Sequence, residues 1–374
     1  MKYSVIIPVF NRPDEVGELL QSLCRQTCKD FEVIVVEDGS SITCKDVCDQ
    51  YADILSLHYY YKQNSGPGQS RNYGAERANG EWLIILDSDV VLPEGYIESI
   101  QQNLQPLQTL PQPLPAAFGG PDAAHPDFTP IHKAISYSMT SFFTTGGIRG
   151  GKGKKLDKFF PRSYNMGIRR EVYQELGGFS KMRFGEDIDF SYRIVEAGYK
   201  TALIPEAWVW HKRRTDFRKF FRQVYNSGIA RINLTKRHPG TLKLVHLLPT
   251  VFTIGVIGCL LAWLVGEGLF CYGTLHADPA TTQPRYATVG LWISIIALLP
   301  ILLFSALILV DSTIRNRSLR VGLLSIPAAF VQLMGYGLGF IEGWWKRCIL
   351  KQDEPSRGEQ TEDERTAFEK KFYN

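Results

Sequence analysis

The chain has 374 residues, a hydrophobic fraction of 44% and a formal net charge of only +4. This length allows one large domain or two of ordinary size, and the small net charge gives no reason to expect a nucleic-acid partner. Seven cysteines in so long a chain exclude a small disulfide-stabilised fold and suit a reducing, cytosolic compartment.

Strand-like and helical patterns alternate through the first hundred residues. Strands are expected at residues 3–10, 31–36, 55–61 and 82–86, and helices at residues 13–26, 43–51 and 69–78. This alternation predicts an α/β domain with a mostly parallel sheet and helices on both faces. In such a sheet the ligand crevice lies at the carboxyl ends of the strands.

The strand at residues 82–86 is followed by two carboxylates, Asp87 and Asp89. At the end of a buried strand these groups repel each other, and a divalent cation such as Mg²⁺ or Mn²⁺ would relieve that repulsion. For the pair taken alone, a turn and helix cap before Pro93 is the alternative.

Three more residues are expected at the same edge of the sheet. Pro8 lies near the end of the first strand. Asp38 follows the second strand and suits ribose hydroxyls or the N–H of a base, with an ordinary Asp-Gly turn as the alternative. Arg71 follows the loop at residues 66–68 and could pair with a diphosphate or be a solvated helix arginine.

Residues 101–160 contain many prolines, which break any long helix, and a strand is expected at 116–120. Residues 144–155 hold five glycines and three lysines. They are predicted to be a surface loop that closes over a site, touches an anionic headgroup or is simply flexible. A strand at 162–168 and a helix at 170–176 follow.

Carboxylates return at the start of the next helix, with Glu186, Asp187 and Asp189. All three favour the helix dipole there, and one of them could instead face the crevice as a base. His211 ends an extended segment at residues 207–211. A lone histidine in such a place is more often structural than a ligand.

Three uncharged apolar runs at residues 247–266, 290–310 and 321–341 are each long enough to span a bilayer. Ten Lys and Arg residues lie between His211 and His246, but only one lies between the first two runs. The three runs predict a multi-pass inner-membrane protein, and the positive-inside rule places its α/β domain in the cytoplasm. Basic residues after the third run leave a re-entrant third segment open.

The segment at residues 217–232 has apolar residues at helical spacing among basic ones. This pattern predicts either an amphipathic helix at the membrane interface or a helix packed on the catalytic domain.

Taken together, seven stretches resemble the family 2 glycosyltransferases with a GT-A fold, in the order and spacing of that family. The stretches are SVIIPVFN at 4–11, VVEDGS at 35–40, GPGQSRN at 66–72, LDSD at 86–89, GGF at 177–179, GEDID at 185–189 and His211. They cover about residues 3–211, and the apolar runs are not part of the match.

The resemblance implies that Asp187 is the catalytic base. The other matching residues are assigned to the nucleotide and donor (Pro8, Asp38, Arg71 and Asp87), to a divalent metal, Mn²⁺ or Mg²⁺ (Asp87, Asp89 and His211), and to the acceptor side (Gly178, Phe179 and Glu186). The processive synthases of the family carry Gln-x-x-Arg-Trp after the base. Residues 221–226 lack that Trp, which favours the addition of one sugar per encounter.

The resemblance implies an inverting, metal-dependent glycosyltransferase of the bacterial polysaccharide or glycolipid type. Its partners would be a nucleotide-sugar donor, a lipid-linked glycan or saccharide acceptor and the membrane. The alternatives are a polyprenyl-phosphate glycosyltransferase and a non-catalytic nucleotide-sugar-binding scaffold. The expected domains are a catalytic domain at 1–212, a basic interfacial segment at 213–245, a transmembrane region at 246–345 and a polar tail at 346–374.

Overall fold

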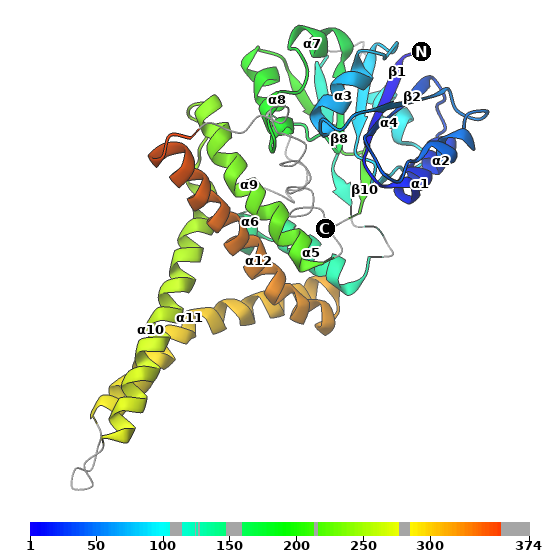
Figure 1. Cartoon of the computed structure of the whole chain (residues 1–374). Coiled ribbons are helices and arrows are strands. Elements are labelled where there is room, and N and C mark those ends of the chain that lie inside the picture. The colour runs from blue at the N-terminus through cyan, green and yellow to red at the C-terminus, as the bar shows by residue number, and fades with distance from the viewer. Residues whose placement is uncertain are drawn as a thin grey trace.

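The computed structural model describes residues 1–104, 114–123, 125, 128–146, 159–212, 216–276 and 285–352. In these residues an α/β domain is followed by long helices (Figure 1). The predicted order, with the apolar helices after the α/β domain, is confirmed.

The α/β domain contains a seven-stranded sheet in the order β3-β2-β1-β4-β8-β6-β9. Its strands are β1 (Tyr3–Val9), β2 (Phe31–Asp38), β3 (Leu57–Lys62), β4 (Trp82–Leu86), β6 (Ala117–Gly119), β8 (Asn165–Arg169) and β9 (Thr201–Leu203). Strands β1 to β4 are parallel, and β6 is parallel to β9. Strand β8 is antiparallel to both β4 and β6. The mostly parallel sheet is therefore confirmed, with one reversed strand.

Apolar side chains cover both faces of this sheet. Val5 and Ile7 of β1 belong to one core cluster, and Ile6 belongs to the other. The first face is covered by α1 (Pro13–Cys24), α2 (Lys45–Asp49) and α4 (Tyr96–Asn103), and the second by α3 (Pro67–Ala75), α7 (Arg170–Glu175) and α8 (Glu186–Glu196). Burying each such side chain contributes roughly 1.5–3 kcal/mol, which is why these strands are continuous apolar runs.

A second, three-stranded sheet lies at the carboxyl edge of the first. Its order is β5-β10-β7, with β5 (Val90–Val91), β10 (Val209–His211) and β7 (Asp122–Ala123). Strand β10 pairs antiparallel with β5, so that His211 lies opposite Val90.

Part of the region that the prolines interrupt forms helices. These are α5 (Pro130–Thr140) and α6 (Phe142–Thr145), and α5 packs against the C-terminal helices through Ile135 and Met139. The loop predicted at residues 144–155 begins inside α6, and residues 147–158 lie outside the described residues.

The remaining helices are α9 (Phe217–Arg237), α10 (Leu248–Leu275), α11 (Arg285–Asn316) and α12 (Leu319–Trp344), with a short 3-10 helix, η1 (Leu244–His246), before α10. The three apolar ones are long and apolar enough to cross a membrane. In their most apolar windows, 11%, 17% and 44% of the residues are buried, in chain order. The third apolar run is one uninterrupted helix over Leu319–Trp344, so it contains no re-entrant turn.

Helix α9 lies side by side with α12, between the α/β domain and the α10–α11 pair (Figure 1). The two helices approach closely because α12 has glycine at every fourth position, at Gly335, Gly339 and Gly343. A Cβ atom at Gly339 would lie only 2.0 Å from the carbonyl oxygen of Tyr225. The C-terminal half of α9 also packs on Gly185 of the α/β domain. Helix α9 therefore contacts the α/β domain, as one of the two alternatives predicted. Its most extensive contact, however, is with the apolar helix α12.

Candidate active site

Asp87, Asp89 and His211 come together where the two sheets meet. Strand β4 ends at Leu86, and the pairing of β10 with β5 brings His211 Nε2 to 3.3 Å from Asp89 Oδ1. Among the described residues, these three form the group whose ligand atoms lie within 4.8 Å of one another in a way that could hold a metal ion. Two carboxylates and an imidazole are a donor set that suits Mn²⁺ and related divalent ions.

Arg12 joins this group, and the sequence analysis did not identify it. Its Nη1 donates to Asp89 Oδ2 at 2.7 Å. Arg12 comes three residues after β1 ends, at the edge where the ligand crevice was expected. Its position after the strand was thus visible in the sequence, but its pairing with Asp89 depends on the folded chain.

Arg71 connects this carboxylate group to helix α8. The residue is only 3% exposed, and it donates from Nη2 to Asp87 at 2.8 Å and from Nη1 to Glu186 at 3.0 Å. Its guanidinium also lies 5.2 Å from the centre of the Phe179 ring. Burial raises the pKa of Glu186, while Arg71 opposes that shift. Arg71 is therefore neither a solvated arginine nor an unpaired one.

Asp187 stands in the first turn of α8, next to Glu186. Gly185 precedes the helix with a φ of 84°, a left-handed conformation that glycine adopts without steric cost. Arg162 Nε lies 2.8 Å from Asp187 Oδ2 and is the second arginine that the sequence analysis did not identify. This charged contact holds the Asp187 carboxylate in one orientation.

Asp38 lies at the end of β2, as expected, but its carboxylate already has several partners. It accepts hydrogen bonds from the backbone N–H groups of Ser65 and Gly66, at 2.8 and 2.7 Å, and pairs with Lys62. The residue is thus well placed to fix the loop that leads into α3. Pro8 is buried in β1, where it lies opposite Val36 of β2.

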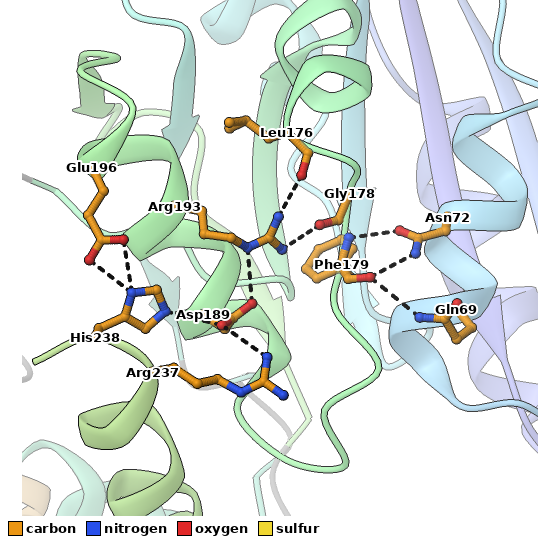
Figure 2. A network of polar contacts seen from close by, with 10 residues as sticks. All are labelled: Gln69, Asn72, Leu176, Gly178, Phe179, Asp189, Arg193, Glu196, Arg237 and His238. Carbon is orange, nitrogen blue, oxygen red and sulfur yellow. Dashed lines mark hydrogen bonds and ion pairs between the residues drawn. The ribbon is translucent and has the colours of Figure 1, made fainter. Parts of the chain in front are cut away.

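Gly178 and Phe179 form a tight turn whose backbone is held on both sides (Figure 2). Asn72 contacts both the N–H and the carbonyl of Phe179, at 2.8 and 2.9 Å, while Arg193 donates to the carbonyl of Gly178. The Phe179 side chain is buried in the core of the domain. The turn therefore fixes the start of the following segment, whose residues 183–188 line the cavity described below.

The same network continues to the end of α9 (Figure 2). Asp189 pairs with Arg193 at 3.1 Å and contacts His238 Nε2 at 3.1 Å. His238 Nδ1 lies 2.8 Å from Glu196. The imidazole is thus held between two carboxylates of α8, which docks the C-terminal end of α9 on the helix that carries Asp187.

A cavity of about 1450 Å³ adjoins these groups. Its wall includes Asp89, Glu186 and Asp187 at one end, and Leu248, Pro249, Leu333 and Tyr336 of the apolar helices at the other. Arg222 and Arg231 of α9 also line this cavity. The cavity therefore connects the carboxylate group with the helices that are candidates for membrane spans.

Comparison with known sequences identifies two overlapping matches. Residues 4–177 match the model described as glycosyl transferase family 2, and residues 157–313 match the model described as glycosyl transferase family group 2. Together the two matches extend from residue 4 to residue 313.

Two named relatives are similar over part of their length. The pre-mycofactocin glycosyltransferase of Mycobacterium tuberculosis is 26% identical over 280 residues, which cover 71% of this chain and 53% of that protein. The validoxylamine A glucosyltransferase of Streptomyces hygroscopicus is 38% identical over 233 residues, which cover 55% of this chain and 54% of that protein. The chain thus spans about half the length of these relatives.

A solved structure supports the fold. A mannosyltransferase from Pyrobaculum calidifontis, in complex with GDP-Man and Mn²⁺, aligns with a TM-score of 0.51 at 14% identity and covers 92% of this chain. The alignment covers 88% of that structure. With the family matches across residues 4–313 and the GT-A type of sheet, the chain belongs to the family 2 glycosyltransferases.

Proposed function

We propose that this protein transfers a sugar from a nucleoside-diphosphate donor to a lipid-linked or saccharide acceptor, with inversion at the anomeric carbon. The observation that carries the proposal is the shared wall of one cavity, where Asp89 of the possible metal group and Asp187 of α8 both lie. A transferase needs these two functions, a diphosphate site and a base, next to one space.

The donor side of the proposed site is formed by Asp87, Asp89 and His211, which would hold Mn²⁺ or Mg²⁺. The metal, when bound, supplies positive charge that stabilises the leaving diphosphate. Asp38 is proposed to act on the nucleotide side by fixing the Ser65–Gly66 backbone, and Pro8 by shaping the same edge. Arg71 fixes the orientation of the Asp87 carboxylate through its hydrogen bond from Nη2.

On the acceptor side, Asp187 takes the proton of the attacking hydroxyl group. A bond forms between that oxygen and the anomeric carbon while the bond from this carbon to the diphosphate oxygen breaks. One such displacement inverts the anomeric centre. Arg162 orients the Asp187 carboxylate, and Glu186 lies beside Asp187. The turn at Gly178 and Phe179 is proposed to fix the segment that leads to these two carboxylates.

We also propose that the protein acts at the cytoplasmic face of the inner membrane as a multi-pass protein. Three helices of sufficient length and apolar composition support membrane association, and the excess of Lys and Arg before the first of them supports the orientation. The missing Trp in residues 221–226 supports the addition of one sugar per encounter.

The test is transfer by membranes that contain the full chain. A panel of nucleotide sugars is supplied with Mn²⁺ or Mg²⁺, with and without EDTA, and the lipid extract is analysed for a new glycan. The proposal expects a metal-dependent product of inverted configuration from one donor. Donor binding without transfer to any acceptor would instead support the scaffold alternative, and a sugar attached directly to polyprenyl phosphate would support the polyprenyl-phosphate alternative.

A further inference from the structure

The cavity has one wall that the proposed transfer reaction does not use. This wall is formed by α9, by η1 and the start of α10, and by the middle of α12. Resting on the proposed function, we infer that this wall binds the acceptor as a lipid phosphate, with its phosphate on the α9 arginines and its apolar chain against α10 and α12.

The apolar part of the wall belongs to two candidate membrane helices. Leu248 and Pro249 lie at the start of α10, and Leu333 and Tyr336 lie in α12. Both helices are long and apolar enough to cross a bilayer. A hydrophobic chain that lies in the membrane would therefore meet apolar side chains in the wall of the same cavity that Asp187 lines.

The charged part of the wall comes from α9, a helix of 21 residues that contains no Asp or Glu. Arg222 lines the cavity and forms no ion pair or hydrogen bond with any described residue. Arg231 also lines it; its Nη1 donates to the Tyr192 hydroxyl at 3.2 Å, and its Nε is buried without a partner. Neither guanidinium is thus neutralised by a described carboxylate.

The other end of the cavity is different in this respect. There, Arg12 pairs with Asp89, Arg162 with Asp187, and Lys212 Nζ with Glu18 at 2.7 Å. Burying a charged N–H donor costs free energy unless an acceptor forms a hydrogen bond with it. An anionic group of the ligand would supply that acceptor to Arg231, and a second anionic group would supply a partner to Arg222.

The polar residues between the two arginines suit the same ligand. Gln223, Asn226 and Ser227 line the cavity from α9 without bringing a competing negative charge. The Gln223 and Asn226 amides are neutral donors, whereas the Ser227 hydroxyl donates to the carbonyl of Gln223 at 2.9 Å. The opposite side of α9 packs against the glycines of α12 and is closed. The cavity side is thus the open, positively charged side of the helix.

The spacing of the two arginines separates two kinds of lipid phosphate. Nine positions along a helix correspond to about 13 Å of rise and about two and a half turns, so the two side chains leave α9 on opposite sides, although both line the cavity. A single phosphate on Arg231 leaves Arg222 largely unused, whereas a diphosphate-linked saccharide is long enough to approach both. Bidentate hydrogen bonding of arginine to phosphate oxygens would hold either one.

The experiment measures lipid binding to the full chain in detergent micelles, with D187N as background so that no turnover occurs. The probes are polyprenyl phosphate, a polyprenyl-diphosphate disaccharide and the uncharged polyprenol of equal length. We expect the two phosphate lipids to bind at least about tenfold more tightly than the polyprenol. R231Q should remove this preference for both lipids, and R222Q mainly for the diphosphate lipid.

R218Q is the matched control, because Arg218 is an exposed residue of the same helix that does not line the cavity. It should leave lipid binding unchanged. R231K provides a second variant that keeps the charge and should retain part of the preference. Binding of the nucleotide sugar is measured in every variant and should stay at the parent value, which also shows that the variant is folded.

Three results would overturn the inference. They are equal binding of polyprenol and phosphate lipids, equal loss of binding in R218Q and R231Q, and complete competition by phosphatidylglycerol, which would reduce the site to general headgroup attraction. A parent protein that binds no nucleotide sugar would contradict the proposed function instead. Normal donor binding without a preference for lipid phosphate would contradict only this inference.

Discussion

Replacing Arg71 with methionine tests whether one buried guanidinium holds the two halves of the site together. Arg71 donates to Asp87 and Glu186 at 2.8 and 3.0 Å and is 3% exposed. R71M would leave both carboxylates without this partner. Loss of one partner of a buried pair costs roughly 3–5 kcal/mol, and because the Asp87 side chain is 31% exposed we expect about 2–4 kcal/mol.

Thermal unfolding of the full chain in detergent measures this loss, and titration with a nucleotide sugar measures the donor site. R71M should be less stable and should bind donor weakly, because Asp87 and Glu186 then repel each other without a compensating charge between them. R71K should recover only part of either property, since one ammonium does not reproduce the two-sided contact. K45M, which removes an exposed pair with Asp49, is the control and should behave like the parent. Parent-like stability and donor binding in R71M would refute the reasoning.

Three other changes test separate parts of the account. D89N should weaken metal-dependent donor binding at least tenfold, which isothermal titration with and without Mn²⁺ would check. It should also lower the unfolding temperature, because the pair with Arg12 is lost. G339L should destabilise the protein by several kcal/mol or prevent its folding, because its side chain has no space beside α9; G258L, where a Cβ meets nothing within 4 Å, should fold normally. H238Q should lower the unfolding temperature and the rate of transfer while leaving donor affinity in place, because His238 docks α9 on Asp189 of the helix that carries the base; donor titration and initial rates separate the two effects.

Much of the fold follows from local patterns. Strands β1, β2 and β4 are buried on both faces, so each is a continuous apolar run, and the turn residues between them mark the helices. The three apolar helices were predicted because uncharged runs of that length are rare in the cores of small soluble domains. These features depend on neighbouring residues and can be predicted without tertiary contacts.

The features that local patterns left open depend on contacts between distant segments. The reversed direction of β8 comes from pairing with β4, some eighty residues earlier, and no periodicity encodes it. His211 was expected to be structural when considered alone, and only the pairing of β10 with β5 brings it to Asp89. The packing of α9 on α12 was not predicted, although glycines at every fourth position of α12 were a signal of close helix contact.

The roles of single residues on the proposed acceptor side also depend on contacts between distant segments. Gly178 and Phe179 were assigned to the acceptor by resemblance, yet the Phe179 ring is buried in the core and the turn acts through its backbone. Arg162 and Arg12 were not identified, because their importance comes from pairing with Asp187 and Asp89. A residue that acts through an ion pair can be identified only when the position of its partner in the folded chain is known.

The central claim is that Asp187 removes the proton of the acceptor while the Asp87–Asp89–His211 group serves the donor. The direct test is to measure donor affinity and transfer rate together in D187N, with E186Q as the neighbouring control. The account predicts that D187N binds the nucleotide sugar like the parent but transfers at least a hundredfold more slowly, whereas E186Q keeps a larger share of the rate. Parent-like transfer by D187N, or loss of donor binding in it, would contradict the claim.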